Sequence, residues 1–168
     1  MEIDITKYNK DSLKFIYDEG VEMLEQTFKS YREVIAKSYT ALGIYVTLGT
    51  YCTSQILSGS NEPYRILFYM LVGSMLLCFL VLFKNLMPGS MEMLGVKPDR
   101  LIHSYYEKLQ NNDDQIKTYY KVRIRDLNAA IEKNKIEIDA RTKRFWHSVT
   151  TAIALTVCVL VIFVTTIL

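Results

Sequence analysis

Apolar residues along this 168-residue chain gather into three long runs that contain no Asp, Glu, Lys or Arg. The runs lie between Lys37 and Glu62, between Arg65 and Lys84, and from Phe145 to Leu168. A helix rising about 1.5 Å per residue needs roughly 20 apolar residues to cross the hydrocarbon core of a bilayer. The pattern therefore predicts three transmembrane helices, at 38–57, 66–83 and 146–168.

The segment that precedes the first run has a helical pattern of its own. Apolar residues recur there at spacings of four and three: Tyr17, Val21, Leu24, Phe28, Tyr31 and Ile35. This spacing forms one apolar stripe on a helix, and Asp11–Ser12 supplies an expected N-cap. No proline lies between this segment and the first run, so we expect one continuous helix into the membrane.

After the second run, Met87-Pro88-Gly89-Ser90, Gly95 and Pro98 predict a turn-rich elbow. Helices are expected from about 99 to 110 and from about 114 into the third run. The second of these carries a heptad seam: Tyr120, Ile124, Leu127, Ile131, Asn134 and Ile138. A single polar residue in such a seam can fix register and oligomeric state. The seam is therefore predicted as an oligomer interface; the alternative places Asn134 at the edge of an intramolecular bundle.

The predicted fold class is an all-α integral membrane protein that forms a homo-oligomeric ring. Its expected segments are a cytoplasmic amphipathic helix at 1–37, a transmembrane helix at 38–57, a short periplasmic loop at 58–65, a transmembrane helix at 66–83, a cytoplasmic elbow with helices at 84–145, and a transmembrane helix at 146–168.

The distribution of charge predicts the orientation in the membrane, although the net charge is only +2. Six Lys and Arg residues lie in 1–37 and thirteen in 84–145, against Arg65 alone in 58–65 and none after 145. Basic residues near the ends of spans stay cytoplasmic. Three spans place the two basic segments on one side, so we expect a bacterial inner-membrane protein with a cytoplasmic N-terminus and a periplasmic C-terminus.

The first predicted span differs from the other two. Thr40, Gly43, Thr47, Thr50 and Ser54 follow each other at spacings of three and four, as a small and hydroxyl-rich stripe. Such residues let transmembrane helices pack closely. Alternatively, they line an aqueous path, since a polar face in a membrane must meet protein or water. Three helices cannot enclose a channel, so a pore requires several subunits.

Candidate chemistry is sparse. Cys52, Cys78 and Cys158 fall within the spans and lack metal-ligand spacing, so neither a metal nor another cofactor is expected. No charged ring or carboxylate lies within a span, which disfavours a selective channel or a proton-coupled transporter. No phosphate-binding or nucleophile motif occurs, and we expect no enzyme.

One short pattern matches a nuclease signature. Arg141 is followed by His147, as in the Arg-and-His motif of HEPN ribonucleases, whose paired sites act on RNA. The alternative interpretation is that Lys143, Arg144, Trp146 and His147 populate a membrane interface, where cations and aromatic residues gather. Basic residues between Lys117 and Lys135 could attract RNA or anionic lipid, although acidic residues dilute them and a solvated helix face is the default.

In layout, the chain resembles small membrane proteins encoded in bacterial antiviral loci. The first resemblance is to the HEPN-like membrane accessory protein of type VI-B CRISPR loci, through Arg141 and His147. The second is to the SLATT group of pore-forming effectors, through paired spans with cytoplasmic helices; the third full span departs from that layout. The resemblance implies a pore that depolarises the inner membrane when a partner sensor fires.

The predicted function is accordingly an oligomeric membrane pore acting as an antiphage effector. The alternatives are a membrane-anchored helical scaffold and a HEPN-like RNA-processing accessory protein. Expected partners are membrane lipid, further copies of the chain, and a cytoplasmic protein sensor or RNA-guided effector; no DNA partner is expected.

Overall fold

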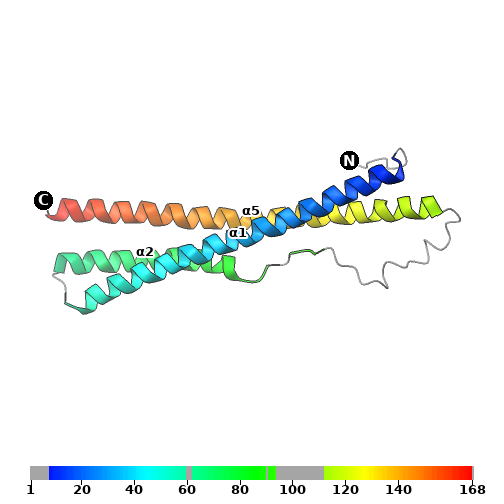
Figure 1. Ribbon diagram of the computed structural model, residues 1–168. Helices are drawn as coiled ribbons and strands as arrows, with labels where there is room; N and C mark the ends of the chain where they lie inside the picture. The colour runs from blue at the N-terminus through cyan, green and yellow to red at the C-terminus, as the bar shows by residue number, and fades with distance from the viewer. Residues whose placement is uncertain (1–7, 60–61, 90, 94–111, 168) are drawn as a thin grey trace. The chain divides into compact units, whose positions relative to one another are not determined.

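The computed structural model describes residues 8–59, 62–89, 91–93 and 112–167. These residues form three helices and no strand: α1 (Lys10–Leu57), α2 (Glu62–Leu86) and α5 (Asn112–Ile167) (Figure 1). The all-α prediction is confirmed for this part of the chain. The helix predicted at about 99–110, and the elbow beyond residue 93, lie outside the described residues.

Helix α1 is one uninterrupted element of 48 residues, as the absence of proline predicted. The cap predicted at Asp11–Ser12 lies instead at Asn9, two residues before Asp11. The backbone N–H of Ser12 donates to Oδ1 of Asn9 at 2.8 Å. At the other end, Gly59 has a φ of 77° and closes α1, a conformation that favours glycine. Helix α5 is likewise continuous over 56 residues.

The chain divides into two compact units. Unit 1 comprises 1–30 and 90–137, and in it α1 and α5 run parallel. Its core is the apolar stripe of each helix: Leu24, Leu127, Ala130 and Ile131, with Tyr17, Val21 and Phe28 packed against them. Gly20 belongs to this contact, because a Cβ added there would collide with Cδ2 of Leu127. The periodicity of both segments therefore predicted the buried faces of unit 1.

Unit 2 comprises 31–89 and 138–168. Helix α2 runs antiparallel to the 31–57 part of α1 and to the 138–167 part of α5 (Figure 1). The core of unit 2 is Leu42, Tyr45, Met75, Cys78, Leu82 and Ala152, with Ala41, Phe79, Leu86 and Phe145 packed against it. Each helix thus contributes one narrow face and leaves the rest of its circumference uncovered.

Two of the described helices are long and apolar enough to cross a membrane. They are Tyr64–Leu86, with a mean hydropathy of 2.7, and a stretch within Asp113–Thr165, with 2.4. Only 22% and 17% of these two stretches are buried, whereas the central helix of a water-soluble protein would be mostly buried. The run at 39–57 is not among them, because threonine, serine, glycine and glutamine lower its hydropathy.

Candidate pore-lining site

The hydroxyl-rich stripe of α1 points away from the core of unit 2. Thr40, Gly43, Thr47, Thr50 and Ser54 are all exposed. On the same helix, Ser38, Leu42, Tyr45 and Cys52 are buried against the other two helices of the unit. Close packing within the chain therefore does not explain the stripe. Its five residues form an uncovered face that another molecule, lipid or water must meet.

The threonine hydroxyl groups of the stripe already donate hydrogen bonds within α1. Thr47 donates to the carbonyl of Gly43 at 2.8 Å, and Thr50 donates to the carbonyl of Val46 at 2.8 Å. Thr40 makes the same contact one turn back, at 3.1 Å to Ala36. The hydroxyl protons of these three threonines are thereby satisfied within α1, while their oxygens still present acceptor lone pairs to the outside. The face can accept hydrogen bonds from water without leaving a donor unpaired.

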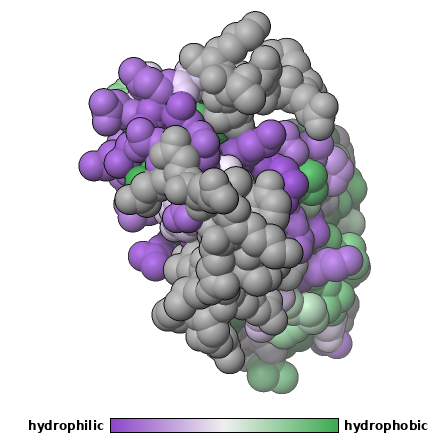
Figure 2. Space-filling model, turned by 90° about the vertical axis from the view of Figure 1, so that its right-hand side faces the viewer, coloured by the Kyte–Doolittle hydropathy of each residue, from purple (hydrophilic) through white to green (hydrophobic). Residues whose placement is uncertain are grey.

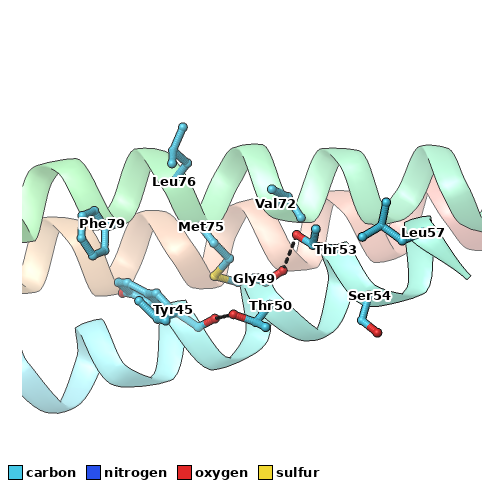
Figure 3. Close-up of a pocket in the computed structure, with 11 residues that line it drawn as sticks. Tyr45, Gly49, Thr50, Thr53, Ser54, Leu57, Val72, Met75, Leu76 and Phe79 are labelled. Atoms are coloured by element: carbon cyan, nitrogen blue, oxygen red, sulfur yellow. Dashed lines mark hydrogen bonds between the residues drawn. The ribbon is translucent and has the colours of Figure 1, made fainter.

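A groove of about 540 Å³ runs along one side of the stripe, between α1 and α2 (Figure 3). Small residues of α1 form one wall: Gly49, Thr50, Thr53 and Ser54. Val72, Met75, Leu76 and Phe79 of α2 form the other. The lining is mainly apolar, and the small side chains of α1 make the hollow, because nothing lies within 4 Å of a Cβ placed on Gly49.

The other uncovered faces of unit 2 are of a different kind. Helix α2 exposes Leu76, Leu77 and Leu80, and α5 exposes Ile153, Val157 and Leu160. These large apolar side chains suit the hydrocarbon of a bilayer. Helix α1 also exposes Ile44 and Leu48 beside its stripe. The stripe is thus a polar band that lies beside exposed apolar side chains, although α5 also exposes Thr150 and Thr151, and charged residues such as Lys37 and Lys143 are exposed elsewhere in unit 2.

Polar side chains at one end of unit 2 form a buried network. Arg141 is only 2% exposed; its guanidinium donates to the carbonyls of Asn85 and Met87, the latter at 3.0 Å, and lies 4.9 Å from the ring centroid of Tyr31. Asn85 donates to Oγ of Ser38 at 3.2 Å and to the carbonyl of Arg141 at 3.0 Å. Sequence reasoning missed Ser38, Asn85 and this role of Arg141, since no local pattern links positions so far apart.

The structure does not bring the two residues of the HEPN-like pattern together. Arg141 turns into unit 2, whereas His147 is exposed. Six residues of helix separate them by about 240° around the axis. The guanidinium is already engaged with backbone carbonyls, so it presents no free cation to a phosphate. Arg141 therefore has a structural role in unit 2, and within one chain it does not lie beside His147.

The heptad seam lies inside unit 1 rather than on a free surface. Leu127 is 1% exposed and packs against α1, and Ile124 and Ile131 are also buried. Asn134 is fully buried: it accepts the N–H of Glu92 at 2.9 Å and donates to the carbonyl of Glu92 at 3.1 Å. The ring of Tyr120 packs in a tilted arrangement against Tyr17 of the same chain, with 5.7 Å between the ring centroids.

Within one chain these residues pack intramolecularly, as in the alternative interpretation, although Asn134 lies inside the bundle and not at its edge. The last of them, Ile138, is half-buried in unit 2. An oligomer interface at this seam stays a prediction. No group of His, Cys, Asp and Glu suited to hold a metal ion occurs among the described residues.

No known protein family, curated protein or solved structure matches this chain. The chemistry of its uncovered faces is what points to a function.

Proposed function

We propose that this protein assembles into a homo-oligomeric membrane pore whose wall is the stripe of α1. The observation that carries the proposal is the contrast between the uncovered faces of unit 2. Helices α2 and α5 expose leucine, isoleucine and valine, whereas the stripe exposes threonine, serine and glycine. The apolar faces meet lipid, and the stripe meets water at the centre of a ring.

The proposal treats the run at 39–57 as a third span. Its lower hydropathy follows from the stripe itself, and a helix that lines a water-filled path needs an apolar surface only on its remaining faces. Helix α1 carries Tyr39, Ile44, Val46 and Leu48 on those faces, all exposed. Three spans and the positions of Lys and Arg then place 1–37 and 84–145 in the cytoplasm and the C-terminus in the periplasm.

The lining predicts a weakly selective pore. Its groups are neutral hydroxyl oxygens that act as acceptors, and no charged side chain lies between Lys37 and Glu62. Ion selectivity needs rings of charge or ordered carbonyl groups. We infer that the open pore dissipates the membrane potential, which agrees with the resemblance of the layout to depolarising effectors of antiviral loci. A cytoplasmic sensor that contacts 1–37 or 84–145 is the partner that this setting implies, and it would increase the opening of a pore that also conducts without it.

Thiol accessibility in vesicles tests the proposal. Thr47→Cys places a thiol on the stripe, and Ile153→Cys places one on an uncovered apolar face of α5. Both are made with Cys158→Ser, because Cys158 is exposed whereas Cys52 and Cys78 are buried. A water-soluble, membrane-impermeant thiol reagent is expected to modify the first variant and to spare the second. Equal protection of both thiols would mean that the stripe is covered by protein or lipid.

A scaffold without a pore is the competing function. It predicts that the thiol at position 47 is protected although the protein still forms stable complexes through its cytoplasmic helices. Charge reversals on those helices would then abolish activity, and changes in the stripe would not.

A further inference from the structure

Unit 1 carries two charged patches of opposite sign on its two helices. The acidic face of α1 consists of Asp18, Glu19, Glu22 and Glu25, and α1 has no Lys or Arg between Lys14 and Lys29. The basic ridge of α5 consists of Lys117, Lys121 and Arg125, and α5 has no Asp or Glu between Asp114 and Asp126. All four acids, Lys121 and Arg125 are exposed, and Lys117 is half-buried.

Both patches point away from the contact between the two helices. Glu22 lies two residues from the buried Leu24, and Arg125 lies two residues from the buried Leu127. One residue corresponds to about 100° and two residues to about 200° around a helix, so the patches extend from the flank of the contact, where Asp18, Glu25 and Lys121 lie, toward its far side. Arg125 forms an exposed ion pair with its neighbour Asp126 at 3.8 Å, whereas none of the ion pairs found in the described part of the chain joins the acidic face to the basic ridge.

The patches also lie at the same height along the parallel helices. Tyr17 packs against Tyr120, and Thr27 is 3.4 Å from Asn134. The residue of α5 that is level with a residue of α1 therefore has a number higher by 103 (120 − 17) to 107 (134 − 27), and the contact of Gly20 with Leu127 gives 107 (127 − 20). Over this range of offsets, Asp18 is level with 121–125 and Glu22 with 125–129, so the acidic face and the basic ridge overlap in height.

We infer that the acidic face of α1 in one copy of this chain binds the basic ridge of α5 in the next copy. A rotation about an axis parallel to the helices preserves height, so patches that are level in one copy stay level between neighbours. Repeating one such head-to-tail contact gives a ring when the rotation between neighbouring copies divides a full turn, and an open filament otherwise. This inference rests on the proposed function and names the surfaces by which the pore assembles.

Charge complementarity selects a second copy over an anionic membrane surface as the occupant. A phosphate-rich surface would attract the basic ridge but repel the four carboxylates that share its height. A second copy satisfies both patches at once. Exposed ion pairs are screened by salt, with a Debye length of about 10 Å at 0.1 M and about 3 Å at 1 M. High salt should therefore weaken assembly of the wild-type protein.

Two reversed variants test the inference: Asp18→Lys with Glu22→Lys, and Lys121→Glu with Arg125→Glu. Each alone places like charges across the contact, so we expect self-association to weaken by about tenfold or more for two reversed pairs. An equimolar mixture should recover assembly as an alternating ring, and so should a single chain that carries all four changes. The readout is the oligomer mass in detergent, with helical content by circular dichroism as the folding control.

Each outcome decides the inference. Recovery in the mixture or in the fourfold variant supports it, even if one reversed variant alone folds poorly. Wild-type assembly in both reversed variants overturns it. Lost assembly without recovery in the mixture or the fourfold variant also overturns it. Lost binding of the Lys121→Glu, Arg125→Glu variant to phosphatidylglycerol vesicles, with assembly intact, would assign the ridge to lipid. Recovered assembly without ion leak would reject the pore and leave the interface standing.

Discussion

Asn85 at the end of α2 and Arg141 in α5 bind each other reciprocally, side chain to backbone. The amide of Asn85 donates to the carbonyl of Arg141 at 3.0 Å, and the guanidinium of Arg141 donates to the carbonyl of Asn85. The last carbonyl groups of a helix have no partner within it, and buried ones need another donor. Arg141 therefore caps α2 and joins it to α5.

The first prediction separates this capping role from a catalytic one. Arg141→Ala leaves the carbonyls of Asn85 and Met87 without their donor and removes the contact with Tyr31, so we expect a loss of about 3 kcal/mol in the free energy of unfolding. His147→Ala changes an exposed side chain and should alter stability by less than about 0.5 kcal/mol. Thermal unfolding in detergent, followed by circular dichroism, gives both values. Equal and small effects of the two changes would contradict the capping role.

The second prediction concerns the buried amide of Asn134. Asn134→Leu removes both hydrogen bonds to Glu92 and the one to Thr27, and we expect unit 1 to lose about 1–3 kcal/mol. Protease cleavage near residues 91–93 should also become faster, because Asn134 holds this segment against α5. Asn128→Leu, at an exposed position of the same helix, is the control. If Asn134→Leu is as stable as Asn128→Leu and is cleaved at the wild-type rate, Asn134 does not fix the segment at 91–93 against α5.

The third prediction compares two glycines of equal helix propensity. Gly20→Ala drives a methyl group into Leu127, which is 1% exposed, so overpacking should cost about 1–3 kcal/mol. Gly73→Ala meets nothing within 4 Å and should stabilise α2 by about 0.5–1 kcal/mol. In a Leu127→Ala background the penalty at position 20 should disappear, which double-mutant unfolding measurements would detect. A stabilising Gly20→Ala in the wild-type background would contradict the close contact.

Periodicity predicted much of this fold. The stripe from Tyr17 to Phe28 and the seam from Ile124 to Ile131 are the buried faces of unit 1, because a regular spacing of apolar residues on a long helix specifies one contact face. The same pattern does not say whether the facing helix belongs to the same chain. From the sequence alone the heptad therefore predicts an oligomer interface, whereas in the structure its residues pack against α1 of the same chain.

What the sequence did not predict depends on contacts across long stretches of chain. By sequence alone Gly20 is only a residue of low helix propensity, since its role in packing appears only when Leu127 lies beside it. Arg141 matches a short nuclease pattern, yet its side chain binds Asn85, Met87 and Tyr31 on other parts of the chain. The spacing from Thr40 to Ser54 predicts that these residues share one face of a helix. The structure adds that no other part of the described chain covers this face.

The most direct test of the pore is the current through a planar bilayer that contains purified protein of defined oligomeric mass. Discrete, protein-dependent conductance is predicted for the wild type. Thr47→Leu with Thr50→Leu should abolish it without changing the mass, because two bulky apolar side chains per subunit would dewet the wall. Thr150→Leu, an exposed threonine of α5 that is also bonded one turn back, should leave it unchanged. A silent bilayer with an intact oligomer, or full conductance in the double variant, would contradict the account.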